Sequence, residues 1–406
     1  MIERSKALTI AVVLVFVSSA LSFYAGAAGV VPRLTQLISL TAPPGGQTEP
    51  ASGIDQKQLR LIKEYIQSKS LYPVSDADLT EGALKGMVAA TQDKYSAFYD
   101  PKEFDTFVRH FEPSFSGIGV HVELSPKTGL VTVVSPIKGS PGDKAGIRAG
   151  DAIVEVDGKD LRGMTLDEAV TYIRGPKGTK VKLKVAREGE TEALSFEITR
   201  ATIEIASTEH KLLEDGVGYL QVKEFNEQVS ERVKKALAEM KAQGMTRLVL
   251  DLRQNPGGLL DEAINVSSQF AAAKEPVVHV EARGEKRETY PSLGKERFPL
   301  PLVVLVDGNS ASASEIVAGA IKDLKIGTIM GVKTFGKGTV QTFFRLEDGS
   351  GIKLTTARYL TAGGNSIHEK GIEPDVVVEN PAAVRLGEPG DVQLQKAIEY
   401  VKTLKR

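Results

Sequence analysis

The chain has 406 residues, of which 41% are apolar and 25% are charged, a composition that is ordinary for a globular protein. This length exceeds one compact core of usual size, so two or three domains are expected. The formal net charge of −1 gives no broad electrostatic reason to expect a nucleic acid partner. The absence of cysteine excludes thiol nucleophiles, disulfides and zinc–thiolate sites.

The N-terminus has the pattern of an export segment. Arg4 and Lys6 precede an uncharged, mostly apolar run from Ala7 to Val31. Positive charge before such a run holds the start of the chain in the cytoplasm and sends the rest across the membrane. The run is long enough for a spanning helix, which needs about 20 residues, but Ala25-Gly26-Ala27 also resembles a cleavage site. Residues 1–31 are therefore a membrane anchor or a cleaved signal peptide, and the remainder is expected in the periplasm or cell envelope.

Two segments without assigned chemistry follow. Residues 32–54 are rich in Ala, Pro, Gly, Gln, Thr and Ser, which indicates a flexible linker. Residues 55–112 form a predicted helical region, because apolar side chains such as Leu59, Ile62 and Ile66 recur near helical spacing. A packing role is expected for this region.

Residues 113–200 read as a small β-rich domain. The segment from Val181 to Val185 alternates strictly between apolar and charged side chains, as a half-buried strand does. One helix is predicted from Leu166, since Thr165 and Glu168 form a capping box in front of an apolar stripe.

Residues 201–380 alternate between strands and helices. Apolar strands are predicted at 219–222, 248–252 and 302–306, with a helix at 227–243 after the first of them. Such units indicate a sheet covered on both faces, with chemistry in the loops after the strands' carboxyl ends. Residues 381–406 form a helical tail whose amphipathic helix is expected to pack on the core or on a partner.

The loop after the strand at 302–306 contains a candidate nucleophile. Ser312 lies in Ser310-Ala-Ser312-Ala-Ser314-Glu315, where small residues crowd the start of a helix. A hydroxyl there meets free N–H groups that favour developing negative charge. The alternative is an ordinary capping box of Ser312 with Glu315, which this segment alone favours.

The loop after the strand at 248–252 offers backbone donors. Gly257 and Gly258 allow the backbone to approach a substrate closely and to present its N–H groups, as an oxyanion hole requires. A plain strand-to-helix turn is the alternative.

A serine nucleophile needs a base, and lysine is the better candidate. None of the five histidines, which are His110, His121, His210, His279 and His368, occupies a comparable small-residue loop. Lys337 lies between two glycines after an apolar strand, and burial there would lower its pKa and yield a neutral amine. Gln341, four residues on, is placed to hold that amine. By itself the Gly-Lys-Gly segment more often forms a solvated turn or a phosphate contact.

Together, the segments Leu252-Arg253-Gln254-Asn255-Pro256-Gly257-Gly258, Ser310 to Glu315 and Gly336-Lys337-Gly338-Thr339-Val340-Gln341 resemble the signature blocks of carboxyl-terminal processing (tail-specific) proteases. The resemblance implies a multidomain α+β protein whose protease core has an α/β, ClpP/crotonase-like fold. It also implies Ser312 as nucleophile, Lys337 as general base and Gln341 as its orienter. The oxyanion hole would combine the N–H of Ala313 with that of Gly258 or Gly257, with Gly258 preferred. No metal or cofactor is implied.

The segment Ser140 to Gly158 resembles the signature of PDZ domains, which capture a C-terminal carboxylate while the last residues of the ligand add a strand to the sheet. Gly117, Ile118, Gly119 and Val120 form the expected carboxylate loop, and a domain that only packs is the alternative. In related proteases the PDZ domain gates the active site. Arg174 is the candidate for sensing ligand, with an exposed charge at a helix end as the alternative.

These features predict a serine endopeptidase that recognises proteins by their free, apolar C-terminal tails. No nucleic acid partner is expected, and the protein could form a homo-oligomer. A non-catalytic PDZ scaffold that regulates a partner protease is the main rival. An acyl-CoA enzyme would also use two backbone N–H groups as an oxyanion hole. This alternative accounts for neither the PDZ-like domain nor the export segment.

Overall fold

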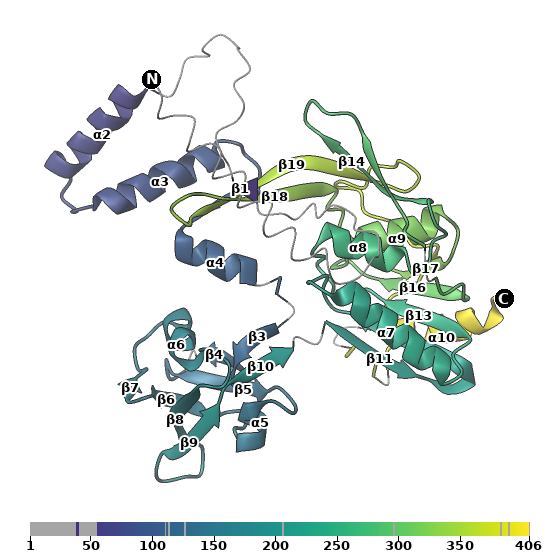
Figure 1. The fold of residues 1–406 in the computed structure, drawn as a ribbon, viewed down its shortest axis with the longest axis horizontal. Coiled ribbons are helices and arrows are strands. Elements are labelled where there is room, and N and C mark those ends of the chain that lie inside the picture. Colours follow the sequence, from purple (N-terminus) through teal and green to yellow (C-terminus); the bar gives the residue numbers. More distant parts are fainter. Residues whose placement is uncertain are drawn as a thin grey trace, which may run out of the picture.

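The computed structural model describes residues 38–39, 55–109, 111–112, 114–125, 127–204, 207–294, 297–381, 384–388 and 390–405 (Figure 1). The predicted export segment and most of the linker lie outside this set. Within it, none of the helices has the length and apolar character needed to cross a membrane.

The N-terminal region contains the predicted helices and one short strand. Asp55 caps the first helix, and Ser75 with Asp78 forms a capping box on the second. The strand pairs antiparallel with a strand of the distant C-terminal half, so this region is fastened to the protease core. Its elements are α2 (Gln56–Lys69), α3 (Asp76–Ala89), β2 (Ala97–Tyr99) and α4 (Pro101–Arg109).

The β-rich domain is built on one antiparallel sheet of order β4-β5-β6-β8-β9, with β7 beside β6. Burial alternates along β8 as predicted, and the capping box of Thr165 and Glu168 is present at α6. A separate ribbon of β3 and β10 leads in and out of the domain. The elements are β3 (Ser114–Gly117), β4 (Val120–Leu124), β5 (Val131–Pro136), α5 (Pro141–Ala145), β6 (Ala152–Val156), β7 (Lys159–Asp160), α6 (Leu166–Ile173), β8 (Lys180–Ala186), β9 (Leu194–Thr199) and β10 (Ala201–Glu204).

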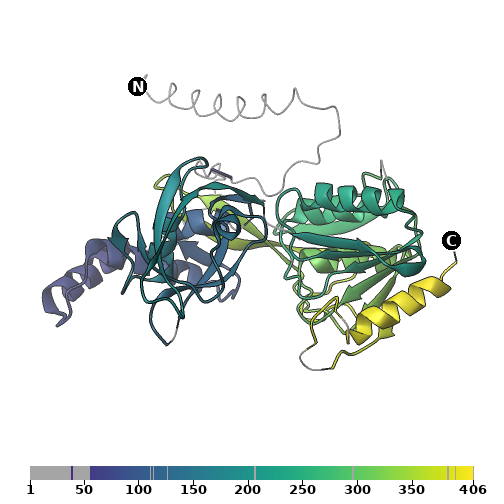
Figure 2. The ribbon, with the colours of Figure 1, turned by 90° about the horizontal axis from the view of Figure 1, so that it is seen from below.

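The third unit contains a largely parallel sheet of order β11-β12-β13-β16-β17-β20. Helices α7, α8 and α9 cover one face, and α10 packs on the other through Leu394, Ala397 and Val401 (Figure 2). The prediction of a sheet covered on both faces is confirmed, and the C-terminal helix packs on the core. The elements are β11 (Thr208–Leu212), η1 (Glu214–Gly216), β12 (Val217–Val222), α7 (Val229–Ala242), β13 (Arg247–Asp251), α8 (Leu260–Ser267), β16 (Leu302–Val306), α9 (Ala313–Asp323), β17 (Thr328–Gly331), β20 (Val376–Val377) and α10 (Val392–Thr403).

A second sheet of the core has the order β1-β18-β19-β14-β15, and β2 pairs with β19. Its long strand β19 is shared between the core and the N-terminal region. The lysine-bearing loop runs directly into β18. The strands are β1 (Ile38–Ser39), β14 (Pro276–Ala282), β15 (Glu288–Pro291), β18 (Thr339–Arg345) and β19 (Gly351–Thr361).

Candidate active site

Two loops meet because the strands that precede them are neighbours. Strands β13 and β16 pair in parallel, so the segments that follow them leave the same edge of the sheet. The backbone oxygen of Asn255 accepts from the backbone N–H of Ala311 at 3.0 Å and from the hydroxyl of Ser314 at 2.9 Å. The Ser310 hydroxyl donates to the Leu252 carbonyl at 2.8 Å. The glycine loop and the serine loop are therefore bonded into one unit.

Ser312 occupies the N-cap position of α9 in an unusual conformation. Its φ and ψ are 54° and −114°, whereas an ordinary N-cap residue is extended. A non-glycine residue at positive φ is strained and persists only where its surroundings enforce it. Such strain is typical of functional positions, so the conformation argues against a simple cap.

The two glycines have different roles in the geometry. A side chain on Gly257 would lie 2.7 Å from Cβ of Ser312 and 2.9 Å from the backbone nitrogen of Ala313, so this position needs glycine. The N–H of Gly257 already donates to the Asn255 side chain at 2.9 Å. Gly258 lies opposite Phe225 in a parallel β-bridge. The Phe225 N–H donates to the Gly257 carbonyl, and the Leu259 N–H donates to the Phe225 carbonyl. In this pattern the N–H of Gly258 points away from Phe225. Of the two glycines, Gly257 already has a partner for its N–H, and Gly258 stays the predicted donor.

Lys337 and Ser312 line one cavity of about 230 Å³, together with Gly257, Gly258 and Ala313. The ammonium of Lys337 lies 5.0 Å from the centre of the Tyr95 ring. Burial lowers the pKa of Lys337, and the positive charge of Lys353 lowers it further, against an opposing effect of Glu315 and Asp93. The site therefore favours the neutral amine more than water does.

The buried carboxylate of Glu315 connects the serine loop to the lysine loop. One oxygen accepts the backbone N–H groups of Ser312 and Lys337, each at 2.9 Å. The other accepts the Thr334 hydroxyl at 2.6 Å and the N–H of Gly336 at 2.8 Å. Sequence reasoning saw Glu315 only as a helix cap, because the lysine loop lies far along the chain.

The hydroxyl of Tyr359 lies between the same two loops. Its single hydrogen is shared between the backbone carbonyls of Ser312, at 3.0 Å, and of Lys337. Burial raises the pKa of Tyr359 well above its ordinary value, so the phenol keeps its proton. Sequence reasoning missed this residue, since an aromatic side chain in a strand carries no signal of such a contact.

The N-terminal region supplies one wall of the cavity, although only a packing role was expected for it. Tyr95 precedes β2, and Phe107 of α4 meets Phe343 of β18 with ring centres 5.0 Å apart. Phe111 also lines the cavity. The wall is apolar, which disfavours water beside the amine.

Gln341 lines the same cavity as Lys337. Its amide nitrogen donates to the hydroxyls of Thr339 at 3.0 Å and Thr355 at 3.1 Å. The pairing of β18 with β19 shifts register between Val340 and Gln341, so the simple alternation used to place Gln341 does not hold along the whole strand. The threonine contacts fix the amide, and its role toward Lys337 remains a prediction.

The expected carboxylate loop connects β3 to β4. Gly119 has φ of 75°, and a side chain there would lie 2.3 Å from Cβ of Ser140, so glycine is required. The carbonyls of Ile118 and Gly119 accept bonds from Gly142 N and the Ser140 hydroxyl at 2.7 and 2.8 Å, which fixes the loop against α5. Gly117 and Val120 end and begin the flanking strands.

Arg174 lies beside β3, the strand that leads into this loop. Its guanidinium is 5.3 Å from the centre of the Phe115 ring, and it lines a second cavity together with Ser116, Thr106 and Arg109. The last two residues belong to α4, the helix that also contributes Phe107 to the catalytic cavity. Arg174 is therefore an exposed residue at the end of α6 on the side of the β-rich domain that faces α4.

Comparisons with known proteins agree with these features. Residues 216–378 match the model of peptidase family S41, and residues 132–187 match that of the PDZ domain. The chain is 39% identical over 359 residues to the carboxy-terminal processing protease CtpA of Bacillus subtilis, covering 88% of this chain and 76% of the relative. It is 35% identical over 335 residues to the carboxyl-terminal-processing protease of Synechocystis, covering 81% and 78%. A candidate S41 protease of Bacteroides fragilis, 16% identical, shares the fold with a TM-score of 0.51 over 88% of this chain and 100% of that one.

Proposed function

Since this chain belongs to the carboxy-terminal processing serine proteases of family S41, which carry a PDZ domain, we propose that Ser312 and Lys337 form its catalytic dyad. The observation that carries the proposal is the shared cavity in which both side chains lie beside Gly257 and Gly258. The neutral amine of Lys337 removes the proton of the Ser312 hydroxyl, and the oxygen attacks the peptide carbonyl.

The backbone N–H groups of Ala313 and Gly258 receive the oxyanion that forms in this step. Ala313 lies at the first turn of α9, where free N–H groups and the helix dipole favour negative charge. The protonated Lys337 then returns its proton to the leaving amine, and water hydrolyses the acyl-enzyme by the same route. Gln341 keeps the lysine side chain in place. The apolar wall that contains Phe107 and Phe343 supports a preference for apolar residues at the scissile bond.

The substrate is recognised through its C-terminal tail. The loop Gly117, Ile118, Gly119 and Val120 receives the terminal carboxylate, and the last residues of the tail pair with the edge of the sheet. Arg174, beside β3 and close to α4, senses the occupied loop and conveys this to the catalytic cavity. The rigid glycine turn at Gly119 supports this assignment.

A cleavage assay with matched substrates tests the proposal. An unfolded protein with an apolar tail is offered with a free or an amidated terminus to the wild type and to Ser312→Ala. We expect the wild type to cleave the free form at least tenfold faster than the amide, and Ser312→Ala to cleave neither. Equal persistence of substrate with both proteins would favour the tail-binding scaffold, and equal cleavage of both substrates would refute recognition through the carboxylate.

The proposal extends to location and assembly. We place the protease domain outside the cytoplasm, behind the N-terminal export segment, and we propose that it self-associates through α2. Apolar side chains on this helix are solvent-exposed; they include Leu59, Leu61, Ile62 and Tyr65. Sedimentation of the wild type and of Ile62→Asp tests the assembly, because a monomer in both cases contradicts it.

A further inference from the structure

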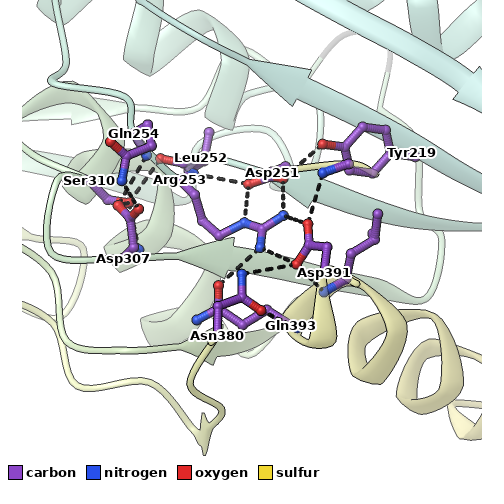
Figure 3. Close-up of polar contacts among 12 residues, drawn as sticks. Tyr219, Asp251, Leu252, Arg253, Gln254, Asp307, Ser310, Asn380, Asp391 and Gln393 are labelled. Carbon is purple, nitrogen blue, oxygen red and sulfur yellow. Dashed lines mark hydrogen bonds and ion pairs between the residues drawn. The ribbon is translucent and has the colours of Figure 1, made fainter. Parts of the chain in front are cut away.

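A fully buried arginine lies immediately before the glycine loop. All five N–H donors of the Arg253 guanidinium are used (Figure 3). Nε and Nη2 donate to the two oxygens of Asp251 at 2.9 and 2.6 Å, and Nη1 and Nη2 donate to those of Asp391 at 2.7 Å each. The remaining Nη1 donor meets Oε1 of Gln393 at 3.0 Å. Arg253 therefore bridges the end of β13 and the start of α10.

The two carboxylates are bonded further on their outer sides. Asp251 accepts the hydroxyl of Tyr219 at 2.9 Å. Asp391 is the N-cap of α10 and accepts the N–H of Leu394 at 3.1 Å and that of Gly387 at 2.8 Å. These donors and the N-terminus of α10 balance a buried cluster that has two negative charges and one positive charge. The cluster is thus built to hold its charges in one arrangement.

The chain on either side of Arg253 connects this cluster to the site. The carbonyl of Leu252 accepts from Ser310, and Gln254 N donates to the Asp307 carboxylate at 3.0 Å. Two residues beyond Arg253, Asn255 bonds to both Ala311 and the N–H of Gly257. The arginine side chain holds the loop from the α10 side, while the backbone of the neighbouring residues Leu252, Gln254 and Asn255 bonds to the serine loop.

We propose that Arg253 is a positioning residue for the oxyanion hole, and that the C-terminal segment acts in catalysis through Asp391. This inference rests on the proposed function of Gly258 and Ala313. A glycine-rich loop has little side-chain packing of its own. An anchor at Arg253, just before the loop, therefore restricts where the Gly258 N–H points. The C-terminal helix is therefore part of the catalytic architecture and not only a cover for the sheet.

Variants of the cluster test the inference, with a control on the same helix. Asp391→Asn keeps the shape but removes the charge that pairs with Arg253. Lys402→Ala breaks the ion pair of α10 with Asp215, at the opposite end of the helix. We expect Asp391→Asn to lower kcat about tenfold or more with KM within about twofold, since misplaced oxyanion donors act on the transition state. Lys402→Ala retains the wild-type kcat.

Further readouts separate positioning from simple loss of structure. All assays are run where circular dichroism shows the proteins folded, and the pH midpoint of kcat is expected to stay unchanged because Lys337 is untouched. Tyr219→Phe removes one bond to Asp251 and leaves the guanidinium paired, so its kcat falls by about two- to fivefold. If Asp391→Asn does not fold, the kcat of Tyr219→Phe tests the inference in its place.

A wild-type kcat in a folded Asp391→Asn would overturn the inference. If Asp391→Asn does not fold, a wild-type kcat in Tyr219→Phe would do the same. The inference would also fail if Lys402→Ala lost as much kcat as the cluster variant. A wild-type kcat in Arg253→Lys would also contradict the inference, because lysine cannot form the bidentate pairs that Arg253 makes with Asp251 and Asp391. Failure of the wild type to cleave any tail-bearing substrate would instead refute the proposed function.

Discussion

The carboxylate of Glu315 lies 2.9 Å from the backbone nitrogen of Lys337, although the two residues are 22 positions apart in the chain. The same oxygen accepts the N–H of Ser312. A single buried charge thus holds the backbone of both proposed catalytic residues. The hydroxyl of Tyr359 bonds to the carbonyls of the same two residues, so each backbone is held on its donor side and its acceptor side.

Neutralising Glu315 should weaken both the fold and the activity. In Glu315→Gln the amide NH2 would face N–H donors that the carboxylate now accepts. We expect a loss of about 3 kcal/mol in the free energy of unfolding, because hydrogen bonds to buried charges are worth about 1.5–3 kcal/mol each. Urea unfolding measures this loss. Glu373→Gln, whose side chain is 67% exposed, is the control and should change stability by less than about 0.5 kcal/mol.

Removing the Tyr359 hydroxyl should lower kcat while the fold survives. Tyr359→Phe removes the one donor that two backbone carbonyls share, at a cost of about 1–2 kcal/mol in the free energy of unfolding. Thermal unfolding and steady-state kinetics measure the two effects. Unchanged kcat in the folded variant would show that the hydroxyl does not help to position Ser312 and Lys337. Tyr72→Phe, at a side chain that is 74% exposed, provides the control.

A methyl group at Gly257 should abolish cleavage. It would meet Ser312 and the backbone nitrogen of Ala313 at less than 3 Å, which forces the serine loop to move. Gly284→Ala is a matched control, since Gly284 also has positive φ, at 76°, but has open space around it. Both variants carry about 1–2 kcal/mol of backbone strain. We expect at least a hundredfold loss of kcat only in Gly257→Ala; comparable losses in both would mean that strain alone is responsible.

The pH dependence of cleavage should respond to the charges around Lys337. The lysine must be neutral, so kcat rises with pH through its pKa, which lies below the ordinary 10.5. The positive charge of Lys353 lowers this pKa, so Lys353→Met should move the rise of kcat to higher pH. Asp93 acts in the opposite sense, and Asp93→Asn should move the rise to lower pH. Shifts in the same direction for both variants would contradict this electrostatic account.

Local signals predicted much of the fold. The apolar strand at 302–306 and the capping box of Thr165 and Glu168 are found as expected, because both depend on neighbours in the chain. The second sheet, in which β2 pairs with the distant β19, had no such signal. The pairing of β2 with β19 joins residues more than 250 positions apart, which periodicity does not encode.

The candidate site divides in the same way. Ser312, Lys337 and the glycine pair stand in short segments of unusual composition, so the sequence singles them out as candidates, and the structure places them around one cavity. The residues that hold them, such as Tyr359 and Glu315, are ordinary in their own segments and acquire their roles only through tertiary contacts. The aromatic wall of the cavity belongs to this second group.

The rate of Ser312 modification by a fluorophosphonate, followed by mass spectrometry across the pH range, tests the dyad most directly. For the wild type we expect the rate to rise through a single ionisation below pH 10.5 and to map to Ser312 alone. In Lys337→Ala the modification rate should fall by about a hundredfold or more, and the rise of the rate with pH should disappear. An unchanged rate and pH profile in a folded Lys337→Ala would show that this lysine is not the base.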